Sequence, residues 1–293
     1  MRQATADLLL LAAALIWGFG FVAQRMGMEH VGPLTFNGLR FLLGGVWLLP
    51  LAICGRPRFL PEAPKRIPVL RAGCWAGLLL FCGAYLQQSG LVYTTAGKAG
   101  FITDLYVILV PIFGLFFGQS ANPGTWLGAL LATAGLYLLS IQGDCLIGRG
   151  DLLVLAGTIF WALHVLLLGY LSPRTHPLRL ALVQYLFCSL LSLALAIPLE
   201  RPDGRALLAA TGPVLYGGVC SVGIGYTLQV VAQRWAHPAH AAILLSLEAV
   251  FAAFAGWWLL DETIPGRGIT GCGLMLAGML LSQLWPHPRQ DRT

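Results

Sequence analysis

The sequence predicts an all-α polytopic membrane protein with ten transmembrane helices arranged as two inverted five-helix repeats. Hydrophobic residues make up 57% of the 293 positions and charged residues only 10%, whereas about a quarter of a soluble domain is charged. The chain also contains an internal duplication. The matching pairs are Asp7 with Asp151, Trp17 with Trp161, Pro33 with Pro177, Tyr85 with Tyr226, Gln88 with Gln229 and Gly128 with Gly271, all at nearly the same spacing. Because each copy holds an odd number of apolar segments, we expect the copies to lie upside down relative to each other.

Ten apolar segments have the length of about 20 residues that a spanning helix needs. They cover residues 6–26, 33–53, 69–92, 97–118 and 123–142 in the first copy, and 150–171, 177–199, 208–233, 239–260 and 266–285 in the second. Turn residues such as glycine, proline and asparagine separate them. The first segment is interpreted as an uncleaved helix, since nine others follow it. We place the first repeat at residues 1–143 and the second at residues 144–293.

Basic residues lie mainly in the connections between these segments. With a cytoplasmic N-terminus, eleven Lys and Arg side chains fall on the cytoplasmic side and six on the other. This bias predicts both termini in the cytoplasm, with the chain in a bacterial-type inner membrane. Because the basic residues lie in these connections, we attribute the net charge of +6 to their role in membrane topology and expect no nucleic-acid partner. The seven cysteines form no CxxC pair, and we expect neither a metal site nor another cofactor.

Charged side chains inside the predicted spans are candidates for function, because they are costly in a bilayer. Glu248, near the middle of the ninth segment, has to pair, face a wet cavity or hold a proton. It is a candidate for binding a substrate ammonium or for proton coupling; a structural hydrogen bond to a neighbouring helix is the alternative. Asp104 and Lys98 in the fourth segment and Arg40 in the second are further candidates for charge or proton coupling. Arg40 is the expected counter-ion of one carboxylate, and a structural salt bridge is the competing interpretation.

Two tryptophans, Trp17 and Trp161, occupy equivalent places in the two copies. Each lies ten residues, or about 15 Å of helix, beyond the aspartate that opens its segment, which is near the bilayer midplane. Such a pair is a candidate for binding a cation or an aromatic ring, and core packing is the alternative. His164, one turn beyond Trp161, joins the candidate lining, although a lone helical histidine is more often a packing residue. Tyr106 is added because it lies near the repeat position of Glu248.

A tyrosine and a glutamine recur three residues apart in the third and eighth segments, as Tyr85 with Gln88 and Tyr226 with Gln229. Residues at this spacing share a helix face. Both side chains donate and accept hydrogen bonds, which suits a polar solute in a mostly apolar pocket. Hydrogen bonding between helices is the competing interpretation.

Several short stretches resemble the EamA family of the drug/metabolite transporter superfamily. They are AALIWGFGFV at residues 13–22, Leu39-Arg40-Phe41, TAGKAGFITDLYVILVP at residues 95–111, Trp126-Leu-Gly-Ala, Gly135-Leu-Tyr-Leu-Leu, AILLSLEAVF at residues 242–251, Asp261-Glu262 and Gly271. The resemblance covers essentially the whole chain and implies ten helices, a central pathway between repeats and transport of small organic metabolites, often outward. Ala249 departs from the proline that the family usually carries after the glutamate, so a helix break at that position is in question.

The leading hypothesis is a secondary transporter that moves a small organic metabolite by alternating access. The family resemblance favours amino-acid-like or amine solutes and export. We expect a small-molecule substrate and membrane lipids as partners, and a homodimer is left open. No P-loop is present, which disfavours direct use of ATP, and no GxSxG or HExxH motif suggests an enzyme. The alternatives are a structural or signalling membrane protein and, less favoured, a membrane-embedded enzyme.

Overall fold

The computed structural model describes residues 3–54, 67–94, 96–119, 121–140, 148–260 and 266–285, and within these ranges every regular element is a helix. The first half contains α1 (Gln3–Met28), α2 (Pro33–Cys54), α3 (Val69–Leu91), α4 (Ala96–Asp104), α5 (Tyr106–Phe116) and α6 (Pro123–Ser140). The second half contains α7 (Arg149–Leu171), η1 (Ser172–Arg174), α8 (Pro177–Leu199), α9 (Gly204–Ala209), α10 (Thr211–Leu215), η2 (Tyr216–Tyr226), α11 (Thr227–Ala232), α12 (Pro238–Leu245), α13 (Glu248–Leu260) and α14 (Gly266–Leu284). Each expected segment is therefore largely helical.

Eight segments within the described residues are long and apolar enough to cross a membrane. They correspond to α1, α2, α3, α4 with α5, α7 with η1, α8, α10 to α11, and α12 with α13 up to residue 255. The prediction of an all-α polytopic membrane protein is confirmed. The remaining two expected spans, α6 and α14, pack against each other, and the count of ten spans stays a prediction.

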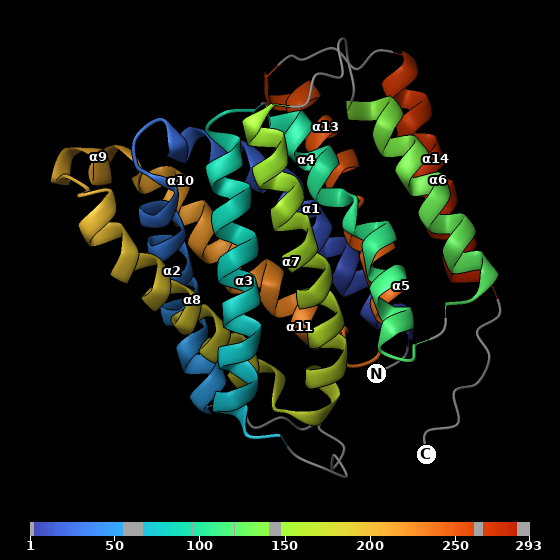
Figure 1. Cartoon of the computed structure of the whole chain (residues 1–293), viewed down its shortest axis with the longest axis horizontal. Coiled ribbons are helices and arrows are strands. Elements are labelled where there is room, and N and C mark those ends of the chain that lie inside the picture. Colours follow the sequence, from blue (N-terminus) through green and yellow to red (C-terminus); the bar gives the residue numbers. More distant parts are fainter. Residues whose placement is uncertain are drawn as a thin grey trace.

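Equivalent helices of the two halves meet in antiparallel pairs. A Cβ atom at Gly128 of α6 would lie 2.7 Å from the carbonyl oxygen of Gly278 in α14, and one at Gly135 would lie 2.5 Å from that of Gly271. The helices α6 and α14 therefore run side by side in opposite directions, as Figure 1 shows, and α2 and α8 do the same. A two-fold axis that relates two antiparallel helices runs perpendicular to them. The two halves of the chain are therefore inverted relative to each other.

The remaining packing follows the same two-fold pattern. Helix α3 packs on α7 and α8, just as η2 packs on α1 and α2. The start of α1 and the end of α14 lie at the same end of the bundle, at the bottom of Figure 1. The first described helix thus begins, and the last one ends, on one side of the bundle, as the expected topology requires, while the side of the membrane stays a prediction.

The fourth and ninth spans are each broken near their middle. One break falls at Leu105, between α4 and α5, and the other at Ser246 and Leu247, between α12 and α13. The break in the ninth span occurs although Ala249 replaces the usual proline of the family. Pro111 lies inside the continuous helix α5. The breaks are thus related by the repeat rather than made by proline.

The eighth span differs from its partner α3 because its middle, η2, is an eleven-residue π-helix. Its sequence YGGVCSVGIGY is rich in glycine, and these glycines meet neighbouring side chains closely. A Cβ atom at Gly218 would lie 2.7 Å from the Leu43 side chain, and one at Gly225 would lie 2.6 Å from Trp17 Nε1. The wider winding of a π-helix changes which residues share a face, so α3 and η2 do not present the same repeat positions to their surroundings.

Candidate functional site

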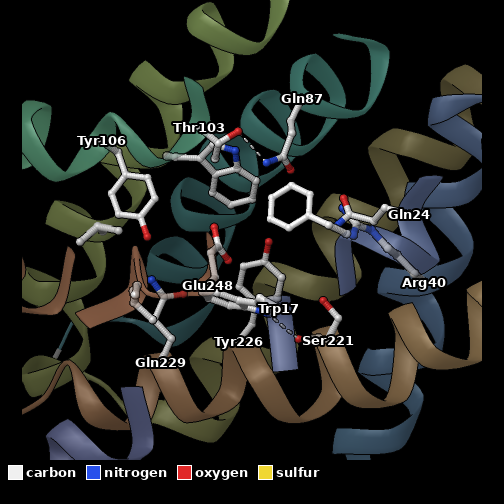
Figure 2. Close-up of a pocket in the computed structure, with 14 residues that line it drawn as sticks. Trp17, Gln24, Arg40, Gln87, Thr103, Tyr106, Ser221, Tyr226, Gln229 and Glu248 are labelled. Carbon is white, nitrogen blue, oxygen red and sulfur yellow. Dashed lines mark hydrogen bonds between the residues drawn. The ribbon is translucent and has the colours of Figure 1, made fainter. Parts of the chain in front are cut away.

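A cavity lies between the two halves and is lined equally by both. From the first half, its walls come from Trp17, Phe21, Gln24, Arg40, Gln87, Thr103 and Tyr106; from the second, they come from Trp161, Val165, Ser221, Tyr226, Gln229, Leu245 and Glu248. The space between these atoms is about 490 Å³, open solvent included. Figure 2 shows the labelled side chains converging on this space from several helices.

Two half-helices begin at the cavity. Tyr106 is the first residue of α5 and Glu248 is the first residue of α13, each directly after a break, and both line the cavity. The N-terminus of a helix carries partial positive charge and free N–H groups. Broken helices of this kind form the midplane sites of many secondary transporters. The breaks therefore place polar backbone beside the cavity from both halves.

The aromatic wall is built around Tyr226. Its ring lies 4.6 Å from the Trp17 ring and 6.1 Å, nearly parallel, from the Trp161 ring. The Trp17 indole N–H donates a 3.1 Å hydrogen bond to the Ser221 carbonyl oxygen, which holds that ring against η2. Phe41 and Tyr185 support Tyr226 from behind, at 5.9 and 6.4 Å. Both repeat-related tryptophans thus reach the same cavity.

Glu248 is a buried carboxyl group at the cavity and has a second carboxyl group beside it. Asp104, the last residue of α4, is fully buried and interacts electrostatically with Glu248. Neither Asp104 oxygen accepts a hydrogen bond from the described residues. Asp104 itself is not part of the cavity wall. The two halves of the protein therefore each contribute one acid to a buried pair.

Arg40 lines the cavity from α2 and is 1% exposed. Its guanidinium carbon lies 5.4 Å from the Phe36 ring centre and 5.1 Å from that of Phe41. Within the described residues it forms no salt bridge with a carboxylate, and its Nε and Nη2 atoms donate to no acceptor. The expectation that Arg40 neutralises Asp104 or Glu248 is therefore wrong for this conformation, because the arginine is held among aromatic rings.

Other polar atoms at the cavity are also without a hydrogen-bonding partner among the described residues. They are Gln24 Oε1, Trp161 Nε1 and Gln229 Oε1. Gln87 differs, since its Nε2 donates a 2.9 Å bond to Thr103 Oγ1. The wall thus offers donors and acceptors on several sides of an otherwise aromatic space.

Two predicted site residues of α3 point away from the cavity. Tyr85 stacks on Phe81 at 6.0 Å and Gln88 Nε2 donates to the Gln24 carbonyl oxygen at 3.3 Å; neither lines the cavity. The adjacent Gln87 takes the place expected for Gln88, because α3 is wound as an α-helix and its partner η2 as a π-helix.

His164 is fully buried outside the cavity wall, where its Nε2 lies 2.9 Å from Gln184 Oε1. It pairs α7 with α8, which is the packing role that the sequence left open. Lys98 lies in α4, but its side chain is outside the described part of the chain. Its expected part in charge coupling stays a prediction.

Seven residues of the wall were not among the sequence candidates: Phe21, Gln24, Gln87, Thr103, Val165, Ser221 and Leu245. Some of them carry a helical signal. Phe21 and Gln24 lie one and two turns beyond Trp17, and Val165 lies one turn beyond Trp161, so they share the tryptophans' helix faces. Ser221 had no such signal, because its position depends on the π-helix.

A separate polar network lies away from the cavity. His240 Nε2 is 3.0 Å from Asp7 Oδ1, and His240 Nδ1 is 3.2 Å from Ser282 Oγ. Serine, histidine and aspartate side chains that contact one another in this order also form the nucleophilic triad of some enzymes. Ser282 is fully buried, however, and none of the three residues lines the cavity. The network joins α12, α1 and α14.

Comparisons with known proteins agree with this architecture. The model of the EamA-like transporter family matches residues 4–141 and again residues 148–284. An uncharacterized transporter of Archaeoglobus fulgidus is 29% identical over 97% of this chain and 87% of its own length. The uncharacterized inner membrane transporter YedA of Escherichia coli K12 is 34% identical over 52% of this chain and 49% of its own length.

A solved crystal structure shares the fold, with a TM-score of 0.77 at 20% identity over 97% of this chain and 98% of the other. The two successive matches to one family model account for the duplication in the sequence and for the two-fold packing of the helices. They also confirm the resemblance that the short motifs carried. The chain therefore belongs to the EamA-like transporter family.

Proposed function

We propose that this protein is a secondary transporter that exports small organic metabolites, with amino-acid-like or amine solutes as the favoured class. The observation that carries the proposal is the cavity at the junction of the inverted halves, where both broken helices begin. Carriers built from inverted repeats bind their cargo at such a place and expose it to each side in turn. The names of the relatives, which are transporters, support membrane transport.

Alternating access follows from the way the halves are related. Because the halves are similar and inverted, a rearrangement that closes one end of the pathway has a counterpart that closes the other. The Asp7–His240–Ser282 network holds α1, α12 and α14 together at the end of the bundle where α1 begins and α14 ends. We propose that this network separates when the carrier opens at that end.

The acidic pair supports a proton as the coupling ion. Two neighbouring carboxyl groups that are buried cannot both carry charge without a large electrostatic cost, so at least one is expected to hold a proton. Binding of a substrate ammonium beside Glu248 favours its ionised form and thereby the release of that proton. Asp104 is the nearest group that can accept that proton. Exchange follows when the proton passes on to water on the side from which the substrate entered, and Glu248 takes up a proton again on the other side once the substrate has left.

A structural or signalling protein is the alternative from another class. It has no need for a cavity whose walls come equally from both halves or for unpaired polar atoms within it. An enzyme is disfavoured, because the buried Ser282 has no contact with the cavity. We place the chain in the inner membrane as a multi-pass protein, with both termini cytoplasmic, and a homodimer remains compatible with the exposed apolar helices.

The test compares two carboxylate variants in proteoliposomes. Glu248→Gln removes the acid at the cavity and is expected to abolish the pH dependence of amino-acid or amine flux and to weaken uptake. Glu200→Gln is the matched control, because the Glu200 carboxylate lies at the end of α8 and accepts bonds of 2.8 and 2.7 Å from the backbone N–H groups of Leu34 and Thr35. Loss of the Glu200 carboxylate is expected to weaken the N-terminal cap of α2 and to leave the pH dependence of flux unchanged. Equal pH profiles in wild type and Glu248→Gln contradict the proton role.

A further inference from the structure

The helices α2 and α8 carry different polar residues at the same repeat position. Counting from the matched prolines Pro33 and Pro177, Arg40 in α2 corresponds to Gln184 in α8. Their neighbours Phe41 and Tyr185 correspond as well, and both support Tyr226. Arg40 and Gln184 therefore occupy comparable places on the two sides of the aromatic wall.

Among the described residues, Gln184 has a hydrogen-bonding partner, whereas the Nε and Nη2 atoms of Arg40 have none. Gln184 Oε1 lies 2.9 Å from His164 Nε2, and His164 stands three residues after Trp161 in α7. The residue three positions after Trp17 in α1 is Gly20, which has no side chain to offer. The first half therefore has no equivalent of the hydrogen bond between His164 and Gln184, and Arg40 lines the cavity without it.

An unpartnered guanidinium at this depth is costly. Arginine stays protonated in proteins and presents five N–H donors, and Arg40 is almost completely buried with Nε and Nη2 unbonded to the described residues. Charged groups inside membrane proteins usually face a partner or a pathway. The two aromatic rings beside it, at 5.1 and 5.4 Å, stabilise the charge without bonding those N–H groups. An anion bound in the cavity would supply the missing acceptors.

The acidic pair restricts which anion fits. Arginine binds both carboxylates and phosphates through paired N–H groups. Glu248 also faces the cavity, and Asp104 lies behind it, so a doubly charged phosphate is repelled more strongly than a single carboxylate. Figure 2 shows Arg40 and Glu248 on separate sides of the cavity, with Tyr226 between them in that view. One end of the site thus suits an anion and the other a cation.

We propose that Arg40 is the subsite for a carboxylate of the cargo, so that the solute must carry an acid group as well as an ammonium. This inference rests on the proposed transport function. The ammonium faces Glu248, and the apolar part of the solute lies against Trp17, Trp161 and Tyr226. A simple amine then leaves Arg40 unpaired, and a simple acid leaves Glu248 unpaired. The zwitterion satisfies both ends.

The experiment uses two matched sets of solutes with the purified full chain in proteoliposomes. One set is phenylalanine, phenethylamine and hydrocinnamate; the other is leucine, isoamylamine and isocaproate. Counterflow gives the KM of each. In wild type, the amino acid is expected to have a KM about 10- to 100-fold lower than that of its decarboxylated amine, the range for a hydrogen bond to a charged group.

Two variants address the subsite independently. Arg40→Gln removes the charge, and Gly20→Glu supplies an internal carboxylate from the position equivalent to His164. The atoms nearest to a Cβ atom at Gly20 are Ser221 Oγ at 3.8 Å, Tyr216 Cε1 at 3.9 Å and Ser221 Cβ at 4.0 Å. These are ordinary van der Waals distances, so a side chain can start there. Both variants are expected to erase the advantage of the amino acid over the amine. Gln184→Leu is the control: it lowers stability but keeps that advantage.

The outcomes separate the subsite from the carrier function. If wild type moves the amines as well as the amino acids, or if Arg40→Gln and Gly20→Glu both keep the wild-type preference, the carboxylate subsite is overturned and transport stands. If none of the six solutes moves in wild type, the result counts against both proposals.

Discussion

Replacing His240 by alanine tests how much a buried polar network contributes to this bundle. His240 is 2% exposed and joins α12 to α1 through Asp7 and to α14 through Ser282. In the neutral tautomer with its proton on Nε2, the ring donates to the carboxylate and accepts from the serine hydroxyl at Nδ1. The substitution removes both hydrogen bonds at once.

The expected loss follows from these two bonds. Hydrogen bonds between membrane helices contribute about 0.6 kcal/mol on average and at most about 1.7 kcal/mol, so the pair predicts a loss of about 1 to 3 kcal/mol in the free energy of unfolding. Breaking a buried ion pair in a soluble protein costs about 3–5 kcal/mol. We expect the lower range, because Asp7 Oδ1 also accepts a 3.0 Å bond from Gln3 Nε2 and is not left bare.

The assay is a double-mutant cycle of Asp7→Ala and His240→Ala, with reversible unfolding measured in detergent micelles. A coupling energy of about 0.6 to 1.7 kcal/mol is expected, and Ser282→Ala should cost less than His240→Ala because it removes one contact. A coupling energy within about 0.5 kcal/mol of zero, the usual error of additivity, would refute the assigned network. The solute preference should not change in any of these variants, since none lines the cavity.

Three further predictions concern other parts of the chain. Gly128→Ala should lower stability by about 1–3 kcal/mol in the same unfolding assay, because its Cβ would lie 2.7 Å from a carbonyl oxygen of α14, whereas Gly273→Ala meets nothing within 4 Å and should not. Burial lowers the pKa of His176 below its usual 6.5, so the unfolded chain binds a proton there more readily than the folded one. The free energy of unfolding should therefore fall as the pH drops below about 6.5. In His176→Gln this fall should be smaller. Trp17→Phe removes the 3.1 Å hydrogen bond to the Ser221 carbonyl oxygen and should raise the KM for solute up to about tenfold, without a comparable loss of expression.

Much of the fold could be predicted from composition and repetition alone. Long apolar segments leave few options in a bilayer, because each has to satisfy its own backbone hydrogen bonds. The duplication identified Trp17 and Trp161 as equivalent residues at one depth, and both reach the cavity. Glu248 stood out because a charge in such a segment is rare. These inferences depend on local sequence and on the thickness of the membrane.

The details of the cavity wall depend on backbone geometry that repetition hides. Gln88 was expected beside the cavity because it matches Gln229, yet Gln87 lines it instead. The eleven-residue π-helix η2 changes the face that each residue presents. Similarly, the fourth span breaks at Leu105 and not at Pro111. Neither the glutamine that lines the cavity nor the position of the helix break can be predicted from hydropathy, because hydropathy is averaged over several turns.

Composition and duplication are enough to show a duplicated membrane protein, and they indicate most of the charged and aromatic side chains at the cavity. Which of these side chains meet depends on the packing of the helices. Asp104 and Glu248 come together from different halves, whereas Arg40 lies among aromatic rings with no carboxylate of the described residues bonded to it. The reason is physical: a buried charge is governed by the atoms packed around it, and helices distant in the sequence supply those atoms.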